Sequence, residues 1–361
     1  MAIKELNDLG KTIFMQRYAY PGEKSYAERC KAIARHIASA ESPDMVESTE
    51  KKFYDALSSG DFVPGGRIIF GAGRNKYNLL NCYVIEPQDN IESIGKTIQD
   101  MYKISCAGGG IGFNFSKIRP KGDDIQNIRN SAPGAVSVIK MINEIGNHVR
   151  AGKNRRTALM GILNVTHPDL LEFLYVKLDK GELTNFNISV AVTDRFIEAA
   201  EAGEEWYFTF NNRKYYVYEL DRVSPDKTSK INVVALDEED AVGRAKQHFL
   251  YHPDDKFENV KKIEIKAMDI WSKIWKNAVE SGDPGIYNVD HANKFTNISY
   301  FERLEATNPS LRGDTLVLTN KELSLLKRFM ILKKSINITL LMEIGLLGFV
   351  VFRVRINNYI K

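Results

Sequence analysis

The feature that most constrains the fold is a regular alternation of short apolar runs and amphipathic stretches between residues 64 and 210. The runs "NLLNCYVIEP", "GIGFNFSKIRP" and "TALMGILNVT" predict strands, while "DNIESIGKTIQDMYKIS" and "APGAVSVIKMINEIGNHV" have apolar residues at helical spacing. Strands that alternate with helices usually pair in parallel, because each helix returns the chain to the same end of the sheet. The sequence therefore predicts a mostly parallel α/β sheet or barrel.

The segments on either side of this alternation have different patterns of apolar residues. Residues 25–60 predict two helices, "SYAERCKAIARHIASA" and "ESTEKKFYDALSSG", the second of which stops at Gly60. Residues 213–266 predict a small inserted α+β module, with strands around a helix for which Asp237 is a suitable N-cap. The main pattern resumes with the helix "AMDIWSKIWKNAVESG".

Charge and cysteine content narrow the class of protein. A net charge of +4 over 361 residues gives no case for direct DNA binding. The start "MAIKELNDLGKTIF" has no apolar signal-peptide core. The three cysteines form no CxxC pair, so we expect a reducing cytoplasm rather than a disulfide scaffold or a zinc site. By default, Cys30 in a helix and Cys82 in a strand are expected to be inert core residues, and Cys106 has no assigned role.

A glycine-rich loop at residues 105–122, "SCAGGGIGFNFSKIRPKG", is the strongest local signal. Clustered glycines let the backbone approach a ligand closely. The loop is not a P-loop, and Phe113 stands where a GxGxxG motif needs its last glycine. Lys117, Arg119 and Lys121 supply cations suited to a polyphosphate. The alternative is a tight turn with a solvated basic edge.

A second basic loop, "RAGKNRRTALMG", follows at residues 150–161. Together the two loops predict a nucleotide bound across them. His291 beside Asp290 could belong to a catalytic triad or a metal site, but neither a GxSxG nor an HExxH pattern supports either interpretation. We therefore predict no metal site.

The α/β rhythm is lost after Ser310. The stretch "INITLLMEIGLLGFVVF" superficially resembles a membrane span, but it is slightly short and contains Glu343, so no membrane association is expected. A misfolded, disordered or wrongly translated tail is the favoured interpretation of this segment.

Six segments in order resemble the catalytic chain of ribonucleotide reductases. They are "VPGGRIIFGAG", "NLLNCYVIEP", "GGGIGFNFSKIRPKG", "RRTALMGILNVTHPDLLEF", "NFNISVAVTDRF" and "SGDPGIYNVDHANK" with "LEATNP". The resemblance covers roughly residues 20–309 and is strongest to the adenosylcobalamin-dependent class. It implies a helical N-terminal region, the first half of a ten-stranded α/β barrel and a small α+β insertion. The expected divisions are 1–62 (helical), 63–212 (barrel), 213–266 (insertion), 267–309 (barrel up to the finger loop) and 310–361 (tail).

The resemblance also implies a reaction and its residues. A cysteine radical, generated with adenosylcobalamin, abstracts the ribose 3′-hydrogen, and two further cysteines donate the electrons that remove the 2′-hydroxyl. A thioredoxin-type reductant restores the thiols. Cys82 matches the first reducing cysteine, which reverses the default interpretation of that residue. The expected ribonucleotide-binding residues are Arg67, Asn81, Cys82, Gly110 and Asn308. The residues expected to bind a deoxynucleoside triphosphate or ATP effector are Asp89, Arg119, Lys121, Arg155 and Arg156.

One departure from the family pattern affects activity. The family has a cysteine after Asn-Pro, with glutamate two positions on, whereas this chain has Ser310 and then Arg312. Because an O–H bond is much stronger than S–H, we predict that the chain alone is inactive. The second reducing cysteine, the second barrel half and a C-terminal dithiol are not found either. "SLRGDTLVLT" resembles the first block of an intein, which predicts a splice junction at Pro309–Ser310 and a C-terminal half joined by trans-splicing.

Two alternatives remain open. The chain could be an inactive nucleotide-binding fragment, or part of a class I large subunit that depends on a radical-generating protein. The module at residues 213–266 resembles an insertion that can replace a dimer partner at the effector site in some monomeric members of the family.

Overall fold

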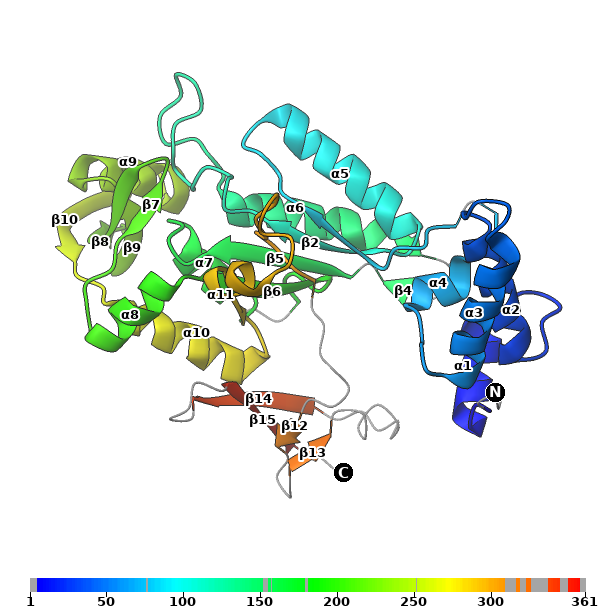
Figure 1. The fold of residues 1–361 in the computed structure, drawn as a ribbon. Helices are drawn as coiled ribbons and strands as arrows, with labels where there is room; N and C mark the ends of the chain where they lie inside the picture. The colour runs from blue at the N-terminus through cyan, green and yellow to red at the C-terminus, as the bar shows by residue number, and fades with distance from the viewer. Residues whose placement is uncertain are drawn as a thin grey trace. The chain divides into compact units, whose positions relative to one another are not determined.

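The computed structural model describes most of the chain in two compact units. It describes residues 5–75, 77–151, 155–156, 158–178, 181–250, 252–308, 316–318, 323–325, 337–344 and 350–357. The first unit comprises Met1–Tyr83, Tyr102–Gly110 and Arg150–Thr157, and the second comprises Val84–Met101, Ile111–Val149 and Ala158–Lys361. Figure 1 labels the elements of both units.

The first unit is mainly helical. Its helices are α1 (Asp8–Arg17), α2 (Tyr26–Ala38), α3 (Val46–Ser59) and α4 (Gly66–Gly71). The Ser25 side chain accepts a hydrogen bond from the Glu28 N–H and begins α2, while Gly60 ends α3 with a left-handed φ of 78°. Cys30 is buried against Ile33, Leu57 and their neighbours. The two predicted helices and the core position of Cys30 are confirmed.

A parallel sheet organises the second unit. Its strand order is β1-β2-β5-β6-β11. The strands are β1 (Cys82–Ile85), β2 (Gly110–Asn114), β5 (Leu159–Asn164), β6 (Phe186–Val192) and β11 (Gly285–Asn288). The pairs β2–β5, β5–β6 and β6–β11 are all parallel. Neighbouring strands follow chain order, so the predicted mostly parallel sheet is confirmed.

Helices connect these strands, as the alternating sequence predicts (Figure 1). They are α5 (Ile91–Cys106), α6 (Ala135–His148), α7 (Leu170–Tyr175), α8 (Asp194–Ala202) and α10 (Ala267–Ser281). The Thr193 side chain accepts a hydrogen bond from the Phe196 N–H and begins α8. A short helix, α11 (Val289–Phe295), follows the last strand of the sheet.

The two faces of the sheet pack against different partners. Side chains alternate along a strand, so Leu159 and Met160 point to opposite faces of β5. A Cβ on Gly146 of α6 would lie 3.4 Å from Leu159 Cδ1, which places α6 on the Leu159 face. Met160 instead packs with Ile162, Ala191 and Ala306. The segment around Ala306 therefore lies on the face of the sheet opposite to α6.

Two residues of β2 accommodate this segment. The Asn114 side chain, which is 1% exposed, donates a hydrogen bond from Nδ2 to the Glu305 carbonyl at 2.7 Å. Gly112 lies under the Thr307 carbonyl, where any Cβ would overlap the oxygen. Asn293 of α11 exchanges two hydrogen bonds with the Leu304 backbone, at 2.7 and 2.8 Å. The last described residues before 309 are thus held across the face of the sheet opposite to α6, which we call the inner face.

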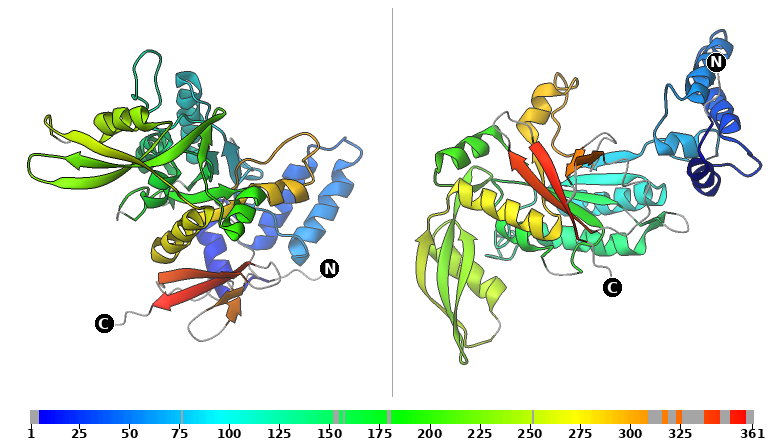
Figure 2. Two further views of the ribbon diagram at one scale, coloured as in Figure 1. Left: turned by 90° about the vertical axis from the view of Figure 1, so that its left-hand side faces the viewer. Right: turned by 90° about the horizontal axis from the view of Figure 1, so that it is seen from below.

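The inserted module has its own core. Its strands are β7 (Phe208–Phe210), β8 (Arg213–Val223), β9 (Thr228–Ala235) and β10 (Lys256–Ile263), and its helix is α9 (Glu238–Phe249). β8 pairs antiparallel with the other three strands. Figure 2 shows α9 lying along one face of these strands, where Ala241 and Ala245 pack against Leu220 and Val233. The Asp237 side chain accepts from the Asp240 N–H, which confirms the predicted N-cap.

Beyond residue 315 the described residues are strands only. They are β12 (Leu316–Leu318), β13 (Leu323–Leu325), β14 (Asn337–Ile344) and β15 (Val350–Asn357), in the order β13-β12-β15-β14. The apolar stretch of the tail contributes to the antiparallel pair β14–β15. Among the described residues, no helix is long and apolar enough to cross a membrane.

The close approach of β2 to the 305–308 segment predicts a specific sensitivity. Gly112→Ala forces the Thr307 backbone to move, so we expect the free energy of unfolding to fall by about 1–3 kcal/mol in urea denaturation. Limited proteolysis should also cut residues 296–308 faster. Gly95→Ala in α5 is the control, because its Cβ meets nothing within 4 Å and alanine should stabilise the helix by about 0.5–1 kcal/mol. Equal stability of Gly112→Ala and the unsubstituted chain would contradict the packing.

Candidate functional site

The first unit brings together four of the residues predicted to bind substrate. Arg67 lies in α4, Asn81 and Cys82 lie at the start of β1, and Gly110 begins β2. The Asn81 Oδ1 accepts a hydrogen bond from the Arg67 N–H at 3.0 Å, and the Asn81 carbonyl accepts from the Gly110 N–H at 2.8 Å. Asn81 therefore fixes both the helix that carries Arg67 and the strand that follows the glycine loop.

The Arg67 guanidinium extends over the glycine loop. Its NH1 donates to the Ala107 carbonyl at 3.4 Å, and a Cβ on Gly108 would overlap the guanidinium. The guanidinium also lies 5.7 Å from the Phe70 ring centroid. The clustered glycines thus let the Arg67 side chain lie directly on the loop backbone. The sequence predicts that a ligand can approach this backbone closely, and the structure shows that the arginine does so.

Cys82 is exposed at the first position of β1. The default expectation of an inert core thiol is therefore wrong for Cys82. Cys106, at the end of α5, is exposed as well. A thiol at the surface can exchange with another thiol or a disulfide, whereas the buried thiol of Cys30 cannot without unfolding.

Five further predicted positions lie at or beyond the limits of what the structure describes. Asn308 belongs to the second unit and is half-buried at the end of the segment that crosses the sheet. Pro309 and Ser310 lie outside the described residues. Arg155 and Arg156 form β4, which pairs antiparallel with β3 (Arg150–Ala151) in the first unit. Of these two arginines only the backbone is described.

In the second unit, the carboxylate of Asp89, which follows β1, forms an ion pair with Arg119, which follows β2. The Arg119 Nε lies 2.7 Å from Asp89 Oδ2, and its NH1 donates to the Asp124 carbonyl at 2.8 Å. Lys117 pairs in the same way with Glu86 at 2.7 Å. The structure therefore joins Asp89 and Arg119, which the family resemblance predicts to belong to one effector site. Lys121 points elsewhere and pairs with Glu172 at 3.2 Å.

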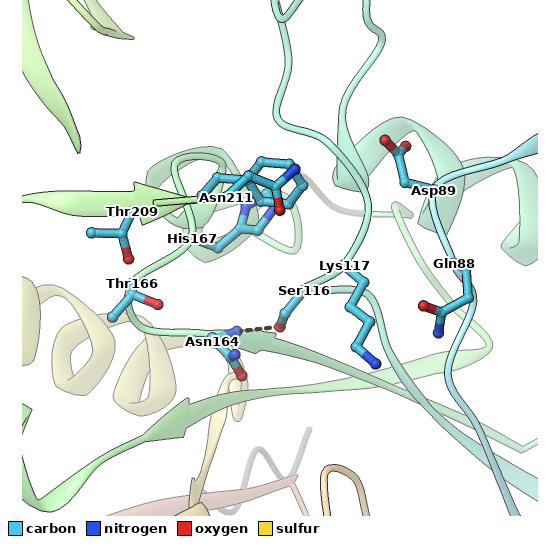
Figure 3. Close-up of a pocket in the computed structure, with 10 residues that line it drawn as sticks. Gln88, Asp89, Ser116, Lys117, Asn164, Thr166, His167, Thr209 and Asn211 are labelled. Atoms are coloured by element: carbon cyan, nitrogen blue, oxygen red, sulfur yellow. Dashed lines mark hydrogen bonds between the residues drawn. The ribbon is translucent and has the colours of Figure 1, made fainter. Parts of the chain in front are cut away.

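A polar cavity of about 410 Å³ lies beside Asp89. Figure 3 shows Gln88 and Asp89 on one side and Thr166 and Thr209 on the other, with Lys117 between them. Most of the lining residues lie at or after the carboxyl ends of β1, β2 and β5, where ligands usually bind in open parallel sheets, and the remaining ones come from the end of β7. Sequence reasoning missed the contribution from Thr166, His167 and Asn211. The position of "THPD" directly after a buried strand was the available signal.

The inserted module contacts the loop that follows Arg119 through a buried charge network. Arg244 of α9 is 3% exposed and Asp123 is 4% exposed. Arg244 NH2 lies 2.7 Å from Asp123 Oδ1, its Nε lies 2.7 Å from Asp240, and its NH1 donates to the Lys121 carbonyl at 2.5 Å. Tyr215 also donates its hydroxyl to Asp123, at 3.0 Å. Both buried charges are therefore paired, as burial requires.

Asn130 provides the second contact between this loop and the module. Its Nδ2 donates to Asp240 Oδ1 at 2.9 Å, and its carbonyl accepts from His248 Nε2 at 3.1 Å. Burial, followed by the positive charge of Lys121, lowers the pKa of His248 from its ordinary 6.5. The ring is therefore neutral at neutral pH and donates one hydrogen bond to the loop.

The helical first unit, and the parallel sheet of the second unit with a segment held across one of its faces, are the architecture expected of part of an α/β barrel with a helical N-terminal region. Two family models match in the corresponding places. "Ribonucleotide reductase, all-alpha domain" matches residues 4–77, and "Ribonucleotide reductase, barrel domain" matches residues 80–311. The chain belongs to the ribonucleotide reductase family.

The relatives agree with this assignment. A vitamin B12-dependent ribonucleoside-diphosphate reductase of Thermoplasma acidophilum is 32% identical over 259 residues, which is 72% of this chain and 28% of that protein. One from Mycobacterium tuberculosis is 28% identical over 307 residues, with 82% and 38% covered. In fold, the class Id ribonucleotide reductase alpha subunit of Actinobacillus ureae matches with a TM-score of 0.55 at 19% identity, over 80% of this chain and 41% of that one. The chain thus spans less than half the length of these relatives.

The low pKa of His248 predicts a pH-dependent stability. As pH falls, the unfolded chain takes up this proton before the folded chain does, so the stabilisation is complete above pH 6.5 and decreases below it. We expect the melting temperature to fall more steeply between pH 7.5 and 5.5 in the unsubstituted protein than in His248→Gln, which can still donate to Asn130 but does not titrate. Lys121, Arg244 and Glu172 face the same ring and are unchanged in both proteins. An equal fall of the melting temperature with pH in the two proteins would contradict the prediction.

Proposed function

We propose that this chain provides the helical region and the first part of the barrel of a ribonucleotide reductase, which reduces ribonucleotides to 2′-deoxyribonucleotides by thiyl-radical chemistry. The observation that carries the proposal is the segment ending at Asn308. It crosses the inner face of a parallel sheet, fixed by Asn114 and packed on Gly112. In this family such a segment presents the radical residue to the substrate.

The proposed substrate-binding group comprises Arg67, Asn81, Cys82, Gly110 and Asn308. The hydrogen bonds of Asn81 to Arg67 and Gly110 support a preformed surface for the first four of these residues. Arg67 offers a cation to a phosphate, and the exposed thiol of Cys82 can supply a hydrogen atom and an electron to the ribose. The second thiol and the second electron would come from a cysteine outside this chain, and a thioredoxin-type reductant would act on the disulfide that this cysteine forms with Cys82.

Adenosylcobalamin is the proposed radical-generating cofactor, supported by the names of the vitamin B12-dependent relatives. Its role when bound is to supply the radical by homolysis of the cobalt–carbon bond. The corrin ring of the cofactor holds the cobalt itself, and the described residues do not identify a site for that ring.

The proposed allosteric site lies at Asp89 and Arg119 and takes a deoxynucleoside triphosphate or ATP. The adjacent polar cavity supports it, because Asp89 lines that cavity and can accept a hydrogen bond from a ribose hydroxyl, while Arg119, which pairs with Asp89, offers a cation to the phosphates. Lys121, Arg155 and Arg156 are the further proposed effector contacts. The network from Arg244 and Asp240 to the 121–130 loop supports a role for the module in holding this site without a dimer partner.

Nucleotide binding to the isolated chain tests the allosteric proposal. Arg119→Ala removes a charge-assisted contact, so we expect calorimetric titration with dATP, dGTP and dTTP to show a Kd at least about tenfold weaker, equivalent to about 1.4 kcal/mol. Arg129→Ala is the matched control, because this arginine on the same loop pairs only with exposed Glu239, at 3.4 Å, among the described contacts. Equal Kd values for Arg119→Ala and the unsubstituted chain would refute the site.

An inactive nucleotide-binding fragment and part of a class I subunit are the alternatives to this function. The first binds effector without turnover even when the remaining barrel is supplied. The second needs a protein radical partner and is indifferent to adenosylcobalamin. Turnover of the reconstituted enzyme with adenosylcobalamin, with a radical-generating protein partner and with neither therefore separates all three.

We further propose that Ser310 begins a protein-splicing element. The support is the sequence "SLRGDTLVLT" at the position where the family carries its radical cysteine. In this chemistry the Ser310 hydroxyl attacks the Pro309 carbonyl, and the peptide bond becomes an ester with a free amine.

Hydroxylamine cleaves such an ester, so treatment of the unsubstituted chain should release a fragment ending at residue 309, as detected by mass spectrometry. Ser310→Ala should remain intact because it has no hydroxyl group. Absence of this fragment from the unsubstituted chain would count against an acyl shift, and the same cleavage in both proteins would exclude Ser310 as its source.

A further inference from the structure

We propose that His167 and Asp169 are positioning residues that hold the loop after β2 in the conformation that presents Arg119 to Asp89, and so set the affinity of the effector site. Both residues belong to the "THPD" turn between β5 and α7. This inference rests on the effector site proposed above.

Asp169 closes the loop at its base. Its Oδ1 accepts from the Lys121 N–H at 2.8 Å, and its Oδ2 accepts from the Ala135 N–H at 2.7 Å. The two ends of the stretch from Lys121 to Ala135 are therefore fastened to one carboxyl group. Gly134 lies so close that a Cβ there would come within 2.6 Å of Asp169 Oδ2. Burial raises the pKa of Asp169, while the two backbone hydrogen bonds act against that rise.

His167 fixes the residue on the other side of Arg119. Its ring is 1% exposed, with Nε2 2.9 Å from the Ile118 carbonyl. The Asp169 N–H donates to Nδ1 at 3.0 Å. Because Nδ1 accepts, Nε2 must carry the hydrogen and donate it to Ile118. The neutral ring thus links the turn to the loop with a defined tautomer.

These bonds bracket Arg119 in the sequence. His167 holds the carbonyl of residue 118, and Asp169 holds the amide of residue 121. Because the backbone is fixed on both sides, the Arg119 side chain is held where its Nε lies 2.7 Å from Asp89 Oδ2. A site whose cation is already placed loses less conformational entropy when it binds phosphate. His167 also lines the cavity itself, so it joins the ligand space to the loop.

Two conservative variants separate the two bonds. Asp169→Asn keeps the size of the side chain but has one acceptor oxygen instead of two, so it loses one end of the loop. His167→Asn retains a side-chain oxygen that can accept the residue-169 N–H in an Asx turn, but it is too short to keep the bond to Ile118. Asp283→Asn is the matched control, because Asp283 also accepts a backbone N–H, from Ile188 at 3.0 Å, and is not among the residues that contact the loop.

The experiment has two readouts in the full chain. Hydrogen–deuterium exchange without ligand should be faster over residues 118–135 in Asp169→Asn and His167→Asn and unchanged there in Asp283→Asn. Calorimetric titration with dATP, dGTP and dTTP should show the Kd about fivefold to tenfold weaker in the first two variants, the effect of about one net hydrogen bond. A purely structural role would lower the melting temperature of all three variants and leave the Kd unchanged.

The reference variant Arg119→Ala distinguishes the two levels of the proposal. If Arg119→Ala weakens binding but the two turn variants bind normally, the positioning role is overturned and the effector site stands. If Arg119→Ala binds normally, the effector site is wrong and so is any effect of the turn on its affinity. Unchanged exchange over residues 118–135 in both turn variants overturns the positioning role whatever the titration shows.

Discussion

The buried ion pair between Asp123 and Arg244 is the interaction on which the architecture of the second unit depends. Each charge would be costly to bury alone, and removal of one partner from such a pair commonly costs about 3–5 kcal/mol. Arg244 also binds Asp240 and the Lys121 carbonyl, so one guanidinium joins α9 to the loop after β2. The module and the loop therefore fold against each other, although 121 residues separate the two charges.

The loop after β2 is consequently held at its base and at its tip. The "THPD" turn fastens its base through Asp169, and α9 fastens its tip through Asn130. Arg119 lies next to the base of the loop, between the residues that His167 and Asp169 hold, and it meets Asp89, which follows β1. One of these anchors belongs to the turn after β5 and the other to the insertion, so both parts of the chain hold the loop that carries Arg119. The outer anchor, at Asn130, comes from the insertion of the same chain.

Local patterns in the sequence predicted most of the elements but few of these contacts. Apolar alternation located β5, and Asp237 marked the start of α9 because both signals depend on neighbouring residues. Helical periodicity predicted the burial of Cys30. It gave no information on Cys82, because burial of a residue at the end of a strand depends on what covers it. The family resemblance alone placed Asp89 with Arg119, and no local signal paired Asp123 with Arg244.

The inner face of the sheet provides a separate constraint on the chemistry. Gly112 has no side chain under the Thr307 carbonyl, Asn114 binds Glu305, and Asn293 binds Leu304. These anchors all precede residue 309, so they fix the approach to the proposed catalytic position whatever residue follows it. A splicing element that begins at Ser310 would leave them undisturbed, and the residue joined to Pro309 after excision would take the position prepared by the sheet. The reductase geometry and a serine at residue 310 are compatible for this reason.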